Sequence, residues 1–191
     1  GQTKFVADMQ PWAQLLAWYG ALNSLVLVTL KYTSPGVPDL YQGNELVDLS
    51  LVDPDNRRPV DYGLRGQWLT DIEAAAATGN LAGSLHGAMV APWDGRAKLA
   101  VTWSLLQLRQ REAALFRDGD YVPLAAAGAQ ADHVLAYART HAGRSVVVFD
   151  KDAAGSGAAR RNAAYLGRVL KHSLPSLMKK VLSLALGELA A

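Results

Sequence analysis

The sequence contains no cysteine, which excludes a disulfide framework and thiolate metal sites. It has no GxSxG nucleophile elbow, and its glycines do not form a Rossmann or GKS/T phosphate loop. The histidines are far apart and show no HxH or HExxH spacing, so we expect neither a metal nor a cofactor. They are His86, His133, His141 and His172.

The N-terminus lacks both an initiator methionine and the basic-then-apolar order of a signal peptide. We therefore expect a cytoplasmic chain that starts within a longer protein. Half of the 191 residues are hydrophobic, which is enough for a folded core.

Charge is unevenly distributed along the chain. Residues 151–191 hold seven Lys/Arg against two acids, a net charge of +5. The preceding 150 residues carry a net charge of −3, which gives the chain its total of +2. An acidic body does not indicate nucleic-acid binding. The tail begins with a linker-like stretch, "KDAAGSGAA", and continues with apolar residues at helical spacing, interrupted by Pro175. It predicts two short basic amphipathic helices.

The uncharged run from Pro11 to Leu30 predicts a helix that begins near Pro11 and ends before Pro35. The run nearly reaches the length of a membrane span, but its scattered polar residues favour a helix packed on several sides. Residues 62–77 and 96–116 predict two further helices, and residues 78–95 read as a connection. Three short strands follow, "YVPLAAA", "HVLAYAR" and "RSVVVFD", the last two joined by a hairpin at "THAG".

Six acids crowd into residues 39–61, where "SPGVPDLYQGNE" and "DPDNRRP" have the composition of turns. Paired carboxylates serve glycoside chemistry, but turns recruit Asp to cap backbone groups in any case. The neighbouring arginines, Arg57 and Arg58, either pair with these acids or face a ligand, and we favour pairing. The acids are Asp39, Glu45, Asp48, Asp53, Asp55 and Asp61.

Two adjoining motifs, "TSPGVPDLYQGNEL" and "DLSLVDPDNRRPVDY", resemble the malto-oligosyltrehalose synthases of the alpha-amylase superfamily. The PGxPxxYxGxE part is shared across that superfamily, whereas the second motif is more specific. The resemblance spans roughly residues 3–150. It implies an α/β fold, the C-terminal part of a (β/α)₈ TIM barrel, followed by the start of a small antiparallel β domain and an atypical helical tail.

The resemblance implies three regions. Residues 1–118 would end the barrel, with its last strand near 36–43, a catalytic-face loop at 44–61 and helices to 116. Residues 119–150 would start the β domain, and 151–191 would form the linker and basic helical tail. The family's catalytic carboxylates lie upstream of this segment, so no residue here is expected to be catalytic. The residues expected to line or support the substrate site are Tyr41, Gln42, Glu45, Asp55, Asn56, Arg57 and Arg58.

The family converts the reducing-end α-1,4 link of a maltooligosaccharide into an α,α-1,1 trehalose link, so the implied partners are that substrate and the missing part of the barrel. Two departures stand out: Val47 replaces the family's tryptophan, and the family pattern stops after "VVVF". We expect an inactive, poorly soluble or oligomeric fragment. The alternatives are a fragment of another alpha-amylase-superfamily glycosidase, a membrane-surface or partner-binding module built on the tail, or a frameshifted tail.

Overall fold

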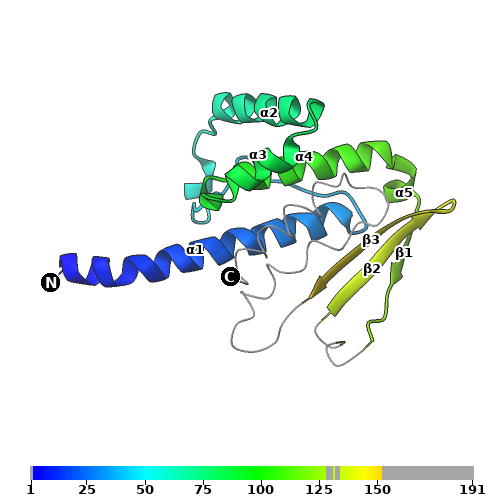
Figure 1. Cartoon of the computed structure of the whole chain (residues 1–191), viewed down its shortest axis with the longest axis horizontal. Helices are drawn as coiled ribbons and strands as arrows, with labels where there is room; N and C mark the ends of the chain where they lie inside the picture. Colours follow the sequence, from blue (N-terminus) through cyan, green and yellow to red (C-terminus); the bar gives the residue numbers. More distant parts are fainter. Residues whose placement is uncertain (1, 128–130, 132–133, 152–191) are drawn as a thin grey trace.

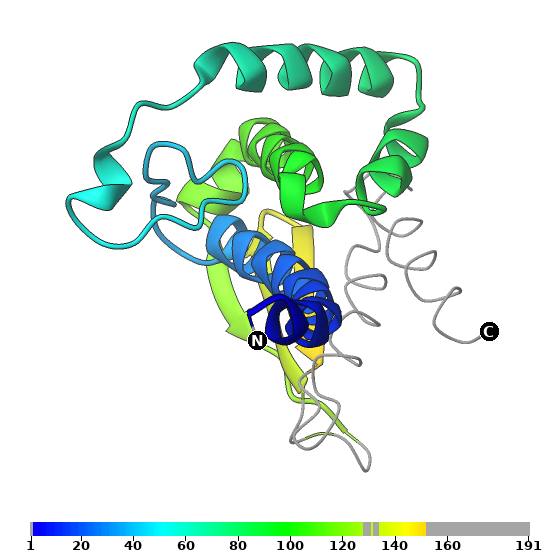
Figure 2. The same ribbon diagram turned by 90° about the vertical axis from the view of Figure 1, so that its left-hand side faces the viewer.

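The computed structural model describes residues 2–127, 131 and 134–151, and the features expected for residues 152–191 lie outside them. A run of helices comes first, and a three-stranded antiparallel sheet follows it (Figure 1). Helix α4 (Arg96–Arg111) lies between α1 (Gln2–Thr33) and α2 (Tyr62–Ala77), as both views show (Figure 2). This order of helices and sheet agrees with the mixed α/β class expected from the sequence.

Helix α1 is longer than the sequence predicted, because it begins at Gln2 and holds Pro11 in its interior. Proline removes one backbone donor and frees the carbonyl one turn earlier. Residues 3–17 are exposed, so water reaches that carbonyl and the helix continues through the proline. The helix ends at Thr33, just before Ser34–Pro35, as expected. By length and composition alone, Thr3–Thr33 would also suffice to cross a membrane, a test that core helices pass as well.

The second half of α1 packs on α4 and forms one part of the core. Leu25, Val28 and Tyr32 of α1 meet Val101 and Leu105 of α4. Burying such side chains contributes about 1.5–3 kcal/mol each relative to exposure. This contact fixes the end of α1, and with it the start of the loop that follows.

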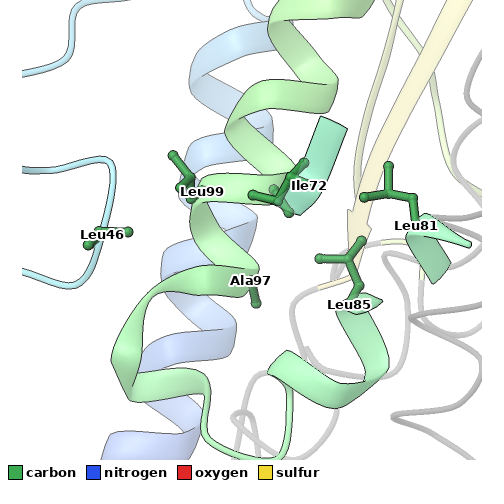
Figure 3. Packing of buried hydrophobic residues seen from close by; sticks show 7 residues of the cluster. Leu46, Ile72, Leu81, Leu85, Ala97 and Leu99 are labelled. Carbon is green, nitrogen blue, oxygen red and sulfur yellow. The ribbon is translucent and has the colours of Figure 1, made fainter. Parts of the chain in front are cut away.

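The opposite side of α4 packs against α2 and α3 (Leu81–Ala88). Asp61 caps α2, because its side chain accepts a hydrogen bond from the Leu64 N–H at 2.9 Å. Helix α3 lies where the sequence predicted only a connection. Leu81 and Leu85, one turn apart, bury their side chains against α2 and α4 (Figure 3). This tertiary packing stabilises a helix that the Gly-rich local sequence did not predict.

The predicted helix over 96–116 is divided in two, since α4 ends at Arg111 and α5 covers Ala113–Arg117. Three strands follow, in the order β1 (Asp120–Pro123), β2 (Val134–His141) and β3 (Arg144–Lys151), each antiparallel to its neighbour. The predicted hairpin is confirmed, with Ala142 and Gly143 at its turn. Leu115 and Phe116 pack on this sheet. The Thr33 and Tyr137 hydroxyls share a buried hydrogen bond of 2.6 Å, which ties α1 to β2.

The structure does not contain the strand expected near residues 36–43. This segment is irregular backbone that leads into a turn. A barrel strand needs ladder partners on both sides. The described part of the chain places no strand beside this segment, and Pro38 offers no backbone donor. Gly36 adds a left-handed φ of 100° at its start.

Candidate functional site

The loop between α1 and α2 surrounds a cavity of about 210 Å³. A 3₁₀ turn, η1 (Asp55–Arg57), lies within this loop and precedes α2. The cavity is lined mostly by polar side chains of the loop, with Arg65 added from the first turn of α2. Its loop residues are Gln42, Gly43, Val47, Asp48, Ser50, Asp55, Asn56, Arg58, Pro59, Val60 and Asp61.

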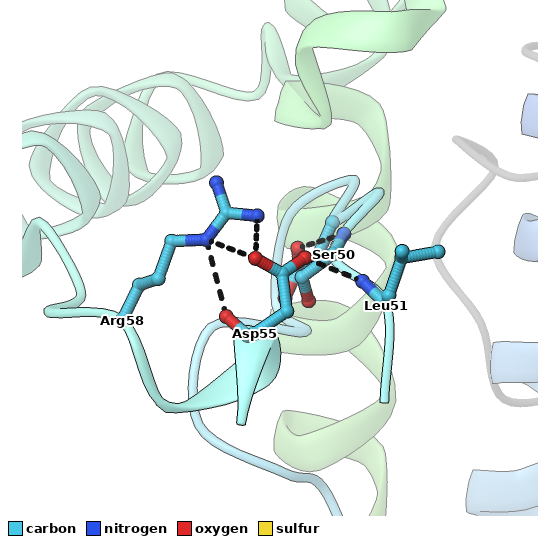
Figure 4. Close-up of polar contacts among 5 residues, drawn as sticks. Ser50, Leu51, Asp55 and Arg58 are labelled. Carbon is cyan, nitrogen blue, oxygen red and sulfur yellow. Dashed lines mark hydrogen bonds and ion pairs between the residues drawn. The ribbon is translucent and has the colours of Figure 1, made fainter. Parts of the chain in front are cut away.

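Asp55 organises the wall of the cavity (Figure 4). One carboxylate oxygen accepts a hydrogen bond from the Leu51 N–H at 2.7 Å, and the other accepts from Arg58 Nε at 2.9 Å. Arg58 Nη2 pairs with the same carboxylate oxygen, and Arg58 Nε also reaches the Asp55 carbonyl at 3.1 Å. The Leu51 N–H, and then Arg58, hold the pKa of Asp55 below its ordinary 3.8. Asp55 is therefore a carboxylate at neutral pH.

Arg65 holds the other side of the loop from α2. Its Nη2 donates to the Gly43 carbonyl at 2.7 Å, its Nε to Glu45 Oε2 at 3.2 Å, and its Nη1 to the Asp61 carbonyl at 3.0 Å. The Arg65 side chain is only 16% exposed and that of Glu45 26%. A guanidinium offers several donors in a fixed plane, so one side chain fixes three points of the chain.

Further cations hold the backbone that leads into the loop. Lys31 Nζ donates to the Asp39 carbonyl at 2.7 Å, and Lys98 Nζ donates to the Leu46 carbonyl at 3.1 Å. Arg109 donates to the carbonyls of Tyr32 at 2.9 Å and Gly36 at 3.1 Å. Lys98 is half-buried, and burial lowers its pKa. With Arg65, four cations from three helices fix carbonyls along residues 32–46.

Gly95 allows the loop to touch the start of α4. Its φ is +88°, and a Cβ placed there would lie 2.5 Å from the Val47 backbone nitrogen. Any other residue would clash with the loop and adopt a strained backbone. The Leu46 side chain enters the core beside α4 next to this contact (Figure 3). The loop is thus held by packing as well as by hydrogen bonds.

The other acids of the loop also have local tasks. Asp48 accepts from the Ser50 N–H at 2.9 Å, which lowers the Asp48 pKa below 3.8. Asp53 pairs with Arg57 at 2.6 Å, so the expected ion pairing of both arginines is what the structure has. A general acid needs a raised pKa. Lowered pKa values at Asp48 and Asp55 indicate structural carboxylates instead, and no cluster of three metal-ligating side chains occurs among residues the structure describes.

The structure brings together four of the seven residues that the sequence selected for the site. Gln42, Asp55, Asn56 and Arg58 line the cavity. Asn56 Oδ1 is buried and accepts no hydrogen bond within the described chain, which is uncommon for a buried amide oxygen.

The remaining three residues do not line the cavity. Glu45 supports the loop through Arg65, while Tyr41 and Arg57 are largely exposed. Sequence reasoning missed Arg65 and Lys98, which act on the loop from helices 20 and 52 positions away. The short-range spacing of the loop residues carried no signal of such distant partners.

Comparisons with known proteins identify relatives of one kind. No protein-family model matches the chain. Over 117 residues it is 41% identical to proposed maltooligosyl trehalose synthases from two strains of Mycobacterium tuberculosis, covering 61% of this chain. The chain spans 12% of the length of these curated relatives. A crystal structure of maltooligosyl trehalose synthase matches 71% of this chain and 18% of its own, with a TM-score of 0.56 and 28% identity.

Two independent likenesses, one in sequence and one in structure, point to the same enzyme. The sequence resemblance described above is thereby confirmed. The chain is homologous to part of maltooligosyl trehalose synthase.

Proposed function

We propose that this chain is the end of the catalytic barrel of a malto-oligosyltrehalose synthase and the start of its C-terminal β domain. The whole enzyme would turn the reducing-end α-1,4 link of a maltooligosaccharide into an α,α-1,1 link by intramolecular transglucosylation. The observation that carries this proposal is the fixed, polar cavity lined by residues 41–61 of the loop between α1 and α2 (the 41–61 loop), within a chain homologous to that enzyme. A cytoplasmic location is proposed on the absence of cysteine alone.

The chemistry of the cavity suits a sugar. Asn56 contributes an amide to the cavity lining and Arg58 a planar set of donors, so the lining residues carry both kinds of partner that a hydroxyl needs. Arg58 is already oriented by Asp55, and a preoriented donor loses little entropy on binding. We assign to this wall the binding of sugar hydroxyls, with Gln42 as a further amide partner.

The catalytic carboxylates of the proposed reaction would belong to the part of the barrel that this sequence does not contain. The acids of the loop support placing the catalytic carboxylates elsewhere, because Asp48 and Asp55 are held as carboxylates and Glu45 is paired with Arg65. Retaining glycoside chemistry needs one nucleophilic carboxylate and one acid with a raised pKa. The loop offers neither in a free form, so its proposed role is binding.

The proposed mechanism gives a rigid wall a specific use. In a double displacement, the oligosaccharide donor would be held covalently through its anomeric carbon while the released glucose stays bound and turns to present its anomeric hydroxyl. That hydroxyl then displaces the enzyme carboxylate, and water must stay away from the covalent intermediate. A loop fixed by Arg65, Lys98 and the Gly95 contact keeps its shape during that step. Wall residues that hold hydroxyls in place would favour transfer within the enzyme over hydrolysis.

A chimera tests the proposal. The homologous 117-residue segment of the Mycobacterium tuberculosis relative would be replaced by that of this chain, and the product incubated with maltopentaose. An α,α-1,1 link occupies both anomeric carbons, so synthesis removes reducing ends without releasing glucose. We expect loss of reducing ends with the chimera and no turnover with the purified 191-residue chain.

The controls separate function from folding. Thermal melting would show that the chimera folds like its parent, whose activity calibrates the assay. A folded chimera that leaves the reducing ends of maltopentaose intact, or releases glucose instead, contradicts the proposed function. Turnover by the 191-residue chain alone contradicts the proposal that the catalytic carboxylates lie outside this sequence.

A further inference from the structure

One face of strand β2 joins the sheet to the helices. Tyr137 and Arg139 are two residues apart on this strand, so their side chains lie on the same face. Both residues are only 2% exposed. The sheet lies beside α5 and the end of α1, the two elements that this face contacts (Figure 1). The two side chains are therefore buried between the sheet and the helices.

Tyr137 holds the last residue of α1 by a directed hydrogen bond. Thr33 Oγ1 donates to the Thr29 carbonyl at 2.6 Å, so its single hydrogen is already used. In the 2.6 Å contact between the two hydroxyls, Tyr137 is then the donor and Thr33 the acceptor. Thr33 is 1% exposed, so water does not compete for this bond. The bond fixes the point from which the chain leaves α1 toward the cavity.

Arg139 holds the end of α5. Its Nη2 donates to the Phe116 carbonyl at 3.1 Å and the Gly119 carbonyl at 3.0 Å, and its Nε donates to the Asp120 carbonyl at 3.3 Å. The last carbonyls of a helix lack donors within the helix, and this guanidinium supplies them from one plane. Arg139 therefore fixes the position of Phe116 relative to the sheet.

Phe116 connects this contact to the chain that precedes the cavity. The guanidinium carbon of Arg139 lies 5.7 Å from the centre of the Phe116 ring, and that of Arg109 lies over the same ring at 4.8 Å. Arg109 in turn donates to the Tyr32 and Gly36 carbonyls at 2.9 and 3.1 Å. The chain that leaves α1 is thus held from β2 by two routes, one direct and one through Phe116.

Gly36 makes these anchors important for the direction of the loop. Its φ is +100°, and a Cβ added there would meet nothing within 4 Å, so packing does not restrict this glycine. Rotation at Gly36 would swing the backbone that enters the cavity lining at Gln42. The course of the loop at its start therefore depends on the groups that hold residues 32–36 in place.

We propose that Tyr137 and Arg139 are positioning residues for the 41–61 loop, because they fix residues 32–36 from the sheet. Tyr137 acts on the end of α1, and Arg139 acts through Phe116. The sheet then supports the cavity wall, although no described strand residue lines the cavity. The use of that wall for sugar rests on the proposed function, whereas the positioning is measured without any sugar.

Hydrogen exchange of single amides in the 191-residue chain, followed by NMR, tests the positioning. The Asn44 and Leu51 N–H groups report on the loop, since they donate to the Tyr41 carbonyl at 3.0 Å and to the Asp55 carboxylate at 2.7 Å. Their exchange measures local opening of the loop. The Thr78 N–H, which makes a 3.1 Å hydrogen bond at the end of α2, is the internal reference.

Two variants remove the anchors. Tyr137→Phe removes only a hydroxyl, and Arg139→Met removes the donors but keeps an apolar stem. Each should speed exchange of the two loop amides at least about 5-fold, the effect of losing one hydrogen bond, and change the reference less than about 2-fold.

The matched controls come from the same sheet. Tyr121→Phe removes a hydroxyl from β1, where the tyrosine is 42% exposed. Arg144→Met removes a guanidinium from β3 that is 69% exposed and pairs with Glu112. Neither residue contacts the chain that leaves α1 through the two routes described, so both controls should leave the loop amides within about 2-fold of the wild type.

Three results would overturn the proposal. They are unchanged loop exchange in either folded anchor variant, an equal rise at Thr78, which would indicate a general loss of stability, and the same rise in the controls. Circular dichroism checks folding, and Tyr137→Phe alone decides the test if Arg139→Met does not fold. Neither result alters what the chimera does with maltopentaose, so the proposed function stands or falls separately.

Discussion

Arg65→Met tests whether one buried arginine holds the candidate site together. Methionine keeps the apolar stem but removes the donors to Gly43, Glu45 and Asp61, which lie at 2.7, 3.2 and 3.0 Å. Exposed ion pairs contribute about 0–1 kcal/mol, and breaking fully buried ones costs about 3–5 kcal/mol. At 16% and 26% exposure the Arg65–Glu45 pair lies between these limits, so we expect a loss of about 2 kcal/mol.

Urea unfolding of the chain at one fixed protein concentration measures this loss. With a slope of about 2 kcal/mol/M, the midpoint should fall by about 1 M at unchanged slope. Arg57→Met is the matched control, because the Arg57–Asp53 pair is 66% and 56% exposed and should cost less than about 0.5 kcal/mol. Equal midpoints for the two variants would refute the role given to Arg65.

Two further substitutions test the loop. Gly95→Ala should destabilise the chain by about 2 kcal/mol or more in thermal melts, because its φ is +88° and its Cβ would meet the Val47 nitrogen. Gly66→Ala, in open space within α2, should stabilise it by about 0.5–1 kcal/mol, and the opposite order would contradict the contact. The folded-state pKa of Asp55 is lowered from 3.8, so its carboxylate stabilises the fold above pH 3.8 and loses this effect as pH falls through the lower folded value. Asp55→Asn should therefore lower the melting temperature more at pH 7 than at pH 3, and an equal loss at both values would rule out this linkage.

The sequence predicted elements where local signals are strong. Residues 62–77 have a helical pattern behind a capping aspartate, and α2 covers Tyr62–Ala77. The three strands were found from short apolar runs between turns, including the Gly143 hairpin. Asp55 and Arg58 were selected from a turn cluster, where side chains interact within a few residues.

The missed features depend on distant contacts. Helix α3 forms because Leu81 and Leu85 pack against α2 and α4. Its glycines and alanines give no local signal that predicts this helix. The strand near 36–43 was expected from a motif, yet a strand requires neighbours for its ladder. Arg65 and Lys98 reach the loop from two different helices, so only the fold reveals them.

The central claim is that the 41–61 loop of this chain forms a wall of a maltooligosaccharide site. Steady-state kinetics of the chimera with maltopentaose, comparing Asn56→Ala with Arg57→Ala, test it most directly. Asn56 Oδ1 is a buried acceptor at the cavity, whereas Arg57 lies outside the cavity lining. Losing one ligand hydrogen bond should lower kcat/KM about 10-fold for Asn56→Ala and less than 2-fold for Arg57→Ala. Equal kinetics for the two variants, at equal thermal stability, would contradict the claim.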